Sequence, residues 1–185
     1  MLVAFAVLHG AAWGLRGPFM QAIRADYFGR MAIGMRLNCD EQVAGGYDTV
    51  TAREVVSQLC AEGLIDYIDL DVGMEPQQFH HGMPHNFIAH QFYRPAVEAV
   101  RSAATVPVLS VLGSITDLRE VEAAIAAGVI DMGGAARQLI AEPDFVQNAR
   151  NGREARSRTC IRCNWCTAAG SEGVQGCAIN PASYR

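Results

Sequence analysis

Val106-Pro-Val-Leu-Ser-Val-Leu112 is apolar along nearly its whole length and is followed directly by Gly113-Ser114. A run with so few polar positions is typical of a strand that is covered on both faces, as in a parallel sheet. Parallel strands are joined by crossover connections, which are usually helices. We therefore expect an α/β protein in which further strands and helices alternate on either side of this run.

Working outward, the same alternation is found along most of the chain. Thr51 and Glu54 have the spacing of a capping box, apolar residues follow at helical intervals, and Gly63 is placed to end that helix. The expected strands are 31–37, 67–72, 106–112 and 129–132, and the expected helices are 51–63, 95–104, 117–128 and 143–150.

The strands recur every 25 to 40 residues or so, which is the spacing of a (β/α)8 barrel. A full barrel needs eight units and about 250 residues. Because this chain supplies about four units, we expect a partial (β/α)8 TIM barrel, formed by about the last four units of that fold.

Composition narrows the function classes. Of 185 residues, 50% are apolar and 18% are charged, which is typical of a globular protein and not of a disordered one. The net charge of -4 shows no basic surplus for nucleic acid. The apolar N-terminal run of about fifteen residues is too short to span a bilayer, so neither nucleic acid nor a membrane is an expected partner.

Four of the six cysteines lie between Cys160 and Cys177. Cys160, Cys163 and Cys166 follow the pattern C-x2-C-x2-C, and Cys177 comes later. Three thiolates in one tight loop with a fourth after it are typical of an iron–sulfur cluster, whereas zinc ligands usually come as two separated pairs. We expect a [4Fe–4S] cluster in a reducing, cytoplasmic compartment. A zinc site and unliganded thiols are the alternatives.

Two glycine-rich segments end the last two strands, Gly113-Ser114 and Gly133-Gly134-Ala-Ala-Arg137. Loops at this end of a barrel often bind phosphate through backbone N–H groups, and Arg137 could add a charged contact. Simple turns and a solvated arginine are the alternative. Arg36 lies inside an otherwise apolar strand, where it needs either a buried ion pair, with Asp69 for example, or a ligand.

Three segments together resemble a known family. They are G-M-R-L-N at 34–38, L-G-S-I-T-D at 112–117 with G-A-A-R-Q-L-I-A-E-P at 134–143, and C-I-R-C-N-W-C with its distant cysteine. Together they resemble the old yellow enzyme superfamily of FMN oxidoreductases, in particular its iron–sulfur branch, which includes trimethylamine dehydrogenase and 2,4-dienoyl-CoA reductase. The resemblance covers residues 30 to 183, and it implies a barrel half at 31–152 and a cluster segment at 153–185, after a poorly matching segment at 1–30.

The resemblance also implies roles for individual residues. Arg36 would lie beside the flavin, where a cation stabilises the anionic reduced form. The residues implied at the FMN phosphate are Gly113, Ser114, Gly134, Ala136 and Arg137, and the implied cluster ligands are Cys160, Cys163, Cys166 and Cys177. Relatives continue into nucleotide-binding domains, so NAD(P)H or FAD would act through domains that this chain lacks. We expect a fragment of a longer enzyme.

The segment 74–92 is rich in histidine and shows no clear helical or strand period. By its position it would cover the flavin, so His80, His81 and His85 are candidates to donate a proton or a hydrogen bond to a small-molecule substrate. Ordinary polarity in a surface loop is the alternative, and a histidine metal site is a further one.

Two other functions compete with the oxidoreductase. A non-catalytic remnant or cluster-only binding module would keep the cysteines without a complete flavin site. A phosphate-binding (β/α) protein with structural zinc would explain the glycines and cysteines without redox chemistry. Under the leading hypothesis we also expect the missing barrel half or a second subunit, and an electron-transfer partner.

Overall fold

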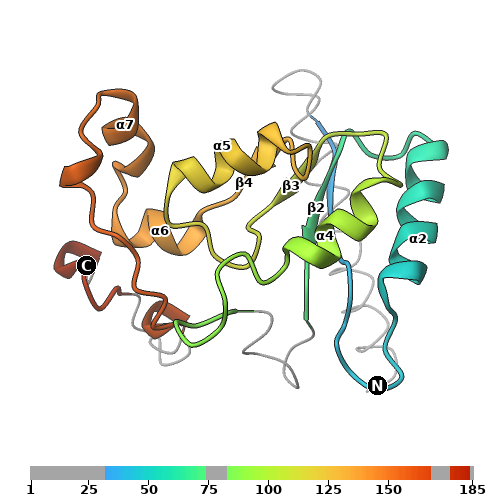
Figure 1. The fold of residues 1–185 in the computed structure, drawn as a ribbon, viewed down its shortest axis with the longest axis horizontal. Helices are drawn as coiled ribbons and strands as arrows, with labels where there is room; N and C mark the ends of the chain where they lie inside the picture. The colour runs from blue at the N-terminus through green and yellow to red at the C-terminus, as the bar shows by residue number, and fades with distance from the viewer. Residues whose placement is uncertain (1–31, 74–82, 168–175, 184–185) are drawn as a thin grey trace, which may run out of the picture.

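The structure is a computed structural model that describes residues 32–73, 83–167 and 176–183. Four strands form one parallel sheet in the order β1-β2-β3-β4 (Figure 1). Their bounds are β1 Gly34–Asn38, β2 Tyr67–Asp71, β3 Val108–Ser110 and β4 Met132–Gly133. The expected α/β class and parallel pairing are confirmed.

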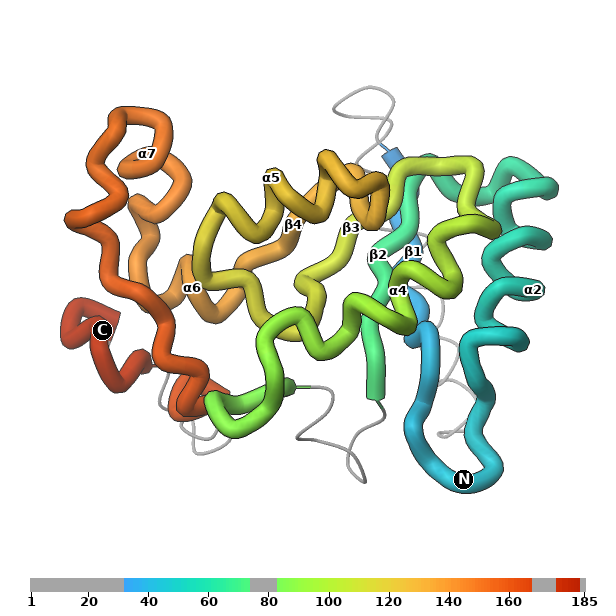
Figure 2. Tube along the Cα trace, viewed as in Figure 1, coloured from blue at the N-terminus to red at the C-terminus, as the bar shows by residue number. Residues whose placement is uncertain are grey.

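Helices connect the strands, as a parallel sheet requires. They are α2 Thr49–Ala61, α4 Arg94–Arg101, α5 Leu118–Ala126, α6 Ala136–Ala141 and α7 Phe145–Arg150, with short 3-10 turns η1 Glu154–Arg156 and η2 Pro181–Ser183. Helix α2 packs beside α4 (Figure 1). Helix α2 and the C-terminal segment lie at opposite ends of the molecule's longest axis (Figure 2).

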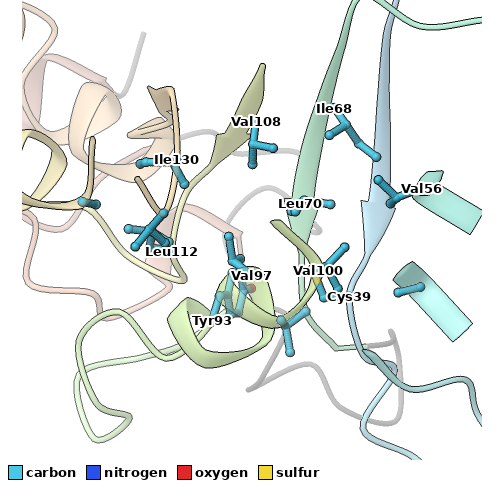
Figure 3. Packing of buried hydrophobic residues seen from close by; sticks show 14 of the residues in the cluster. Cys39, Val56, Ile68, Leu70, Tyr93, Val97, Val100, Val108, Leu112 and Ile130 are labelled. Carbon is cyan, nitrogen blue, oxygen red and sulfur yellow. The ribbon is translucent and has the colours of Figure 1, made fainter. Parts of the chain in front are cut away.

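The core lies between the sheet and its covering helices (Figure 3). Ile68 and Leu70 of β2 point to this side, together with Val108 of β3, and all three are fully buried. Val97 and Val100 of α4 meet them from the helix side. Since side chains alternate along a strand, residues 67, 69 and 71 of β2 face the opposite side of the sheet, and functional groups gather on that side.

The predicted start of the first helix is wrong. Helix α2 begins at Thr49, and its N-cap is Asp48, whose carboxylate accepts hydrogen bonds from the backbone N–H groups of Val50 and Thr51. Thr51 is therefore inside the helix and does not cap it. Asp48 has the extended backbone that a cap needs and reaches those N–H groups first.

Strand β3 is much shorter than the predicted 106–112. Pro107 has no N–H to pair, and Leu112 leaves the strand conformation with a φ of 48°. Strand β4 is likewise short and begins three residues later than expected. The predicted helix at 95–104 ends earlier, at Arg101. Helix α6 was not expected, because the residues after Gly133-Gly134 read as loop.

No helix within the described residues is both long and apolar enough to cross a membrane.

Candidate functional site

A cavity of about 500 Å³ opens at the carboxyl ends of β1, β2, β3 and β4. This is the end at which ligand sites of parallel barrels are built. All the residues expected at a flavin line this one cavity, and a candidate cluster ligand joins them. They are Arg36, Gly113, Ser114, Gly134, Ala136 and Arg137, with Cys160. Segments more than 100 residues apart therefore meet in the arrangement that the sequence predicts.

Arg36 of β1 lies opposite Asp69 of β2, and its Nη1 is 3.6 Å from the Asp69 Oδ2. Its Nη2 makes a closer ion pair with Asp71. The expected pairing with Asp69 is confirmed, but the expectation of burial is wrong, because 57% of the Arg36 side chain is exposed. Strand β1 has a paired neighbour on one side only within the described sheet. Arg36 therefore has a carboxylate partner and also faces the cavity.

Asp71 and Tyr93 are cavity residues that sequence reasoning missed. Asp71 is buried at the carboxyl end of β2, where it pairs with Arg36 and accepts from the N–H of Val72 at 2.9 Å. Burial, the charge of Asp71 and a hydrogen bond to Asp71 together raise the pKa of Tyr93, so its hydroxyl stays protonated. The position of Asp71 at the end of a strand was the available signal.

The glycines of the two strand-end loops are also favoured by the backbone conformation and packing of the loops themselves. Gly113 has a φ of 88°, which favours glycine. A Cβ on Gly134 would come within 2.9 Å of the Val111 side chain, so this glycine allows its loop to lie close to the segment after β3. Both glycines therefore bring bare backbone to the cavity surface.

Arg137, at the start of α6, holds three segments together. Its Nη1 donates to the Pro84 carbonyl at 2.7 Å and to the side-chain oxygen of Asn164, and its Nη2 donates to the Gly113 carbonyl at 2.8 Å. A guanidinium carries five N–H groups, so these bonds to the described residues leave two. Arg137 can act as a structural clamp and still present charge to an anion in the cavity.

The first cysteine is fixed by Gln138, a buried residue that sequence reasoning did not single out. The Gln138 amide donates to the Arg158 carbonyl at 2.7 Å and accepts from the Cys160 N–H at 2.7 Å. Both ends of one side chain thus hold the chain entering residues 160–167, which we call the cysteine loop. Helix α6 carries Arg137 on the cavity side and Gln138 on the loop side.

The four candidate ligand cysteines are all free thiols. The backbone N–H of Arg162 donates to the Cys160 sulfur at 3.4 Å, and Arg162 and Asn164 have positive φ values of 55° and 58°, which turn the loop tightly. Burial raises the pKa of Cys160, and the thiols of Cys166 and Cys177 lie near enough to raise it further, whereas Arg137 opposes them. The thiols of Cys166 and Cys177 therefore lie within electrostatic range of Cys160.

Cys177 is brought to this region by a separate turn. Its N–H is hydrogen-bonded to the Ser183 hydroxyl at 2.7 Å, and it bridges to Asn180. The buried Asn180 side chain donates to the Ile140 carbonyl of α6 at 3.0 Å. No three His, Cys, Asp or Glu side chains among the described residues are close enough together to hold a single metal ion. This holds for the four candidate cysteines as well, so both the cluster and the zinc alternative stay predictions.

Comparison with known proteins gives consistent relatives, although no family model matches the chain. The chain is 31% identical over 157 residues to a probable N-methylproline demethylase of Rhizobium meliloti, covering 80% of this chain and 22% of that protein. It is 29% identical over 126 residues to a multifunctional alkene reductase/demethylase OYE of Caballeronia cordobensis, covering 66% of this chain and 18% of that protein.

Among solved structures, the 6-hydroxypseudooxynicotine amine oxidase of Pseudomonas geniculata N1 superposes with a TM-score of 0.72 at 26% identity, over 87% of this chain and 24% of that one. One of these sequence relatives is itself named as an old yellow enzyme, and the matched solved structure is also an oxidoreductase, an amine oxidase. The chain belongs to the old yellow enzyme superfamily. It spans about a quarter or less of the length of each of these relatives. The four strand–helix units are part of a (β/α) barrel of this superfamily.

The structure describes one of the three candidate histidines, His85. His80 and His81 lie outside the described residues. His85 is described, but it is not among the residues that line the cavity, and its Nδ1 accepts from the Phe87 N–H at 3.1 Å. His90 instead lies 3.4 Å from Glu120 of α5. A proton-donating role for His85 stays a prediction.

Proposed function

We propose that this chain supplies the carboxyl-terminal half of an FMN-binding barrel and a [4Fe–4S] electron relay to an oxidoreductase. One observation carries the proposal, namely that all six expected flavin-binding residues line a single cavity together with Cys160. Membership of the old yellow enzyme superfamily supports the same chemistry.

The cavity has the side chains that a phosphate-bearing flavin needs. FMN, when bound, supplies hydride and single-electron transfer, and the protein supplies binding and electrostatics. Arg137 and the bare backbone of Gly113 and Gly134 would hold the phosphate. The positive charge of Arg36 would stabilise negative charge on the flavin ring system. The ion pair with Asp71 would partly neutralise Arg36 and so weaken that stabilisation.

The thiols of the cysteine loop and its position beside the cavity support a cluster ligand set. Cys160 lines the flavin cavity and lies within electrostatic range of Cys166 and Cys177. A centre held there would exchange electrons with a cofactor in the adjoining cavity without a long gap between them. Cluster thiols must stay reduced until they are loaded, so we propose a cytoplasmic location.

The remaining strands of the barrel would come from outside the four described here, either in a longer chain or from a second subunit. Strands β1 and β4 each have one paired neighbour in the described sheet, which leaves one edge of each available for further strands. NAD(P)H or FAD, a small-molecule substrate and an electron-transfer partner would act through those additional parts.

Anaerobic purification of the full chain tests the proposal. We expect bound FMN, and we expect iron and acid-labile sulfide in amounts equal to each other. Iron and sulfide without any FMN affinity would replace the flavin half of the proposal with the cluster-only module. Zinc as the bound metal would overturn the electron-relay role.

A further inference from the structure

One wall of the cavity is held mainly by the cysteine loop. Residues 83–88, which we call the wall segment, include Met83, whose side chain lines the cavity, and the buried Pro84. This wall segment lies more than 70 residues from the cysteine loop in sequence, yet side chains and backbone groups of the loop bond to it repeatedly. The two segments are therefore packed as one unit.

Arg162 makes the first set of these bonds. It is only 7% exposed, and its guanidinium donates to the carbonyls of Ile88 at 3.0 Å and Asn86 at 3.5 Å. Its own carbonyl accepts from the Asn86 N–H at 3.1 Å. A buried guanidinium is costly to desolvate, and a long side chain at a positive φ adds backbone strain. Arg162 carries both of these energetic costs, and its side chain reaches the wall segment.

Asn164 makes the second set. Its side-chain amide donates to the Met83 carbonyl at 2.7 Å, and its side-chain oxygen accepts from Arg137. Arg137 in turn donates to the Pro84 carbonyl. A continuous chain of hydrogen bonds thus runs from the proposed phosphate arginine, through the cysteine loop, to the cavity wall.

We propose that Arg162 and Asn164 are positioning residues that tie the wall segment to the cysteine loop, so that loading the cysteines with a cluster tightens the cavity's hold on FMN. This inference rests on the proposed function. An empty loop samples more conformations than one whose sulfurs are bound to a common centre. The bonds at Arg162 and Asn164 pass that restriction on to the wall segment. The coupling is reciprocal, so bound FMN also tightens binding of the cluster by the same factor.

The substitution R162G tests the tie without disturbing the loop backbone. Glycine accepts the positive φ at no steric cost and keeps the carbonyl to which Asn86 donates. It removes the side-chain bonds to Ile88 and Asn86 together with the packing of the buried side chain. Affinity is measured by quenching of flavin fluorescence on titration into the full chain, first cluster-loaded and then after anaerobic chelation of iron. For the unmodified chain we expect chelation to weaken FMN binding about tenfold, within the usual range of allosteric coupling.

In R162G we expect iron content to stay normal, cluster-loaded protein to bind FMN as weakly as the chelated unmodified chain, and chelation to change the affinity less than twofold. Hydrogen exchange of residues 83–88 gives a readout that needs no flavin. Exchange should rise on chelation in the unmodified chain and be high in R162G whether or not iron is present. The charge-matched control R156A alters an exposed arginine outside both segments and should behave as the unmodified chain does.

An R162G protein that keeps the full response to chelation would overturn the inference. The inference would also be overturned if chelation changed neither the FMN affinity nor the hydrogen exchange of the unmodified chain. Such a chain would still bind FMN, so the proposed function would remain intact. Cluster-loaded, unmodified chain that binds no FMN at all would overturn the proposed function and this inference with it.

Discussion

Replacing the buried Gln138 with alanine should destabilise the protein more than replacing any exposed residue on the same side of the molecule. The side chain is 1% exposed, and its amide satisfies the Arg158 carbonyl and the Cys160 N–H, each at 2.7 Å. A buried polar group that loses its partner costs about 1–3 kcal/mol. Arg158 is an exposed residue and Cys160 a half-buried one, so water can reach part of what is freed. Together with the buried side-chain volume that is also lost, the total is about 2–4 kcal/mol.

For a chain of this size, 1 kcal/mol corresponds to roughly 2–4 °C in Tm. Gln138→Ala should therefore lower the Tm by roughly 5–15 °C, measured by circular dichroism with urea unfolding as the second assay. Gln138→Glu separates hydrogen bonding from volume, since a carboxylate still accepts from Cys160 but cannot donate to Arg158. It should cost as much as alanine does at nearly constant volume, because the buried carboxylate is desolvated and faces the Arg158 carbonyl oxygen.

The matched control is Gln147→Ala, which removes the same side chain from an exposed position on α7. It should change stability by less than about 0.5 kcal/mol. If Gln138→Ala is no more destabilising than Gln147→Ala, the Gln138 amide does not fix the cysteine loop. If Gln138→Glu is as stable as the unmodified chain, the cost of the alanine variant comes from lost volume alone.

Cys163→Ala should abolish iron binding while Cys60→Ala, outside the ligand set, leaves it unchanged; equal iron in both would remove Cys163 from the ligands. Arg137→Ala should weaken FMN binding roughly 10–100-fold by loss of a charge-assisted contact worth about 1.5–3 kcal/mol, and an unaltered dissociation constant would exclude that contact. Asp71→Asn removes the closer of the two carboxylate partners of Arg36 and leaves only Asp69, so spectroelectrochemistry should show the flavin potential raised by roughly 10–30 mV, where 30 mV is about 1.4 kcal/mol; a lowered potential would contradict this. Burial raises the pKa of Cys39 to about 12. The Cys39 thiol ionises above about pH 8.5 in the unfolded chain but stays neutral in the folded one, so the free energy of unfolding should fall as pH rises from about 8.5 toward 12. Alkylation mapped at pH 8 should label Cys60 well before Cys39.

The sheet was predictable from sequence because each strand has apolar residues between turn residues, and a parallel pairing follows from the helices between them. Strand lengths were less predictable. The run that ends at Leu112 is apolar nearly throughout, but Pro107 has no N–H and Leu112 adopts a positive φ, so only Val108–Ser110 forms the ladder. Apolar character marks burial, whereas a ladder needs hydrogen-bonding backbone as well.

The cavity residues were predictable for a related reason. Gly113 and Arg137 come a few residues after β3 and β4, and the carboxyl ends of parallel strands meet at one edge. The ties at Arg162 and Asn164 were not predictable, because their partners are backbone carbonyls 74 and 81 residues away. Any residue has a carbonyl, so no pattern of side chains marks these partners in the sequence.

Helix α6 shows how local weakness and tertiary contacts combine in this site. It has six residues and no capping side chain, so it is too short to be stable alone. Bonds from Arg137 to the cavity wall, from Gln138 to the cysteine loop and from Asn180 to Ile140 hold it in place. These bonds reach three separate segments, so a shift of α6 would move the proposed flavin contacts and the thiols together. The stability of this short helix is therefore inseparable from the distance between the two proposed redox centres.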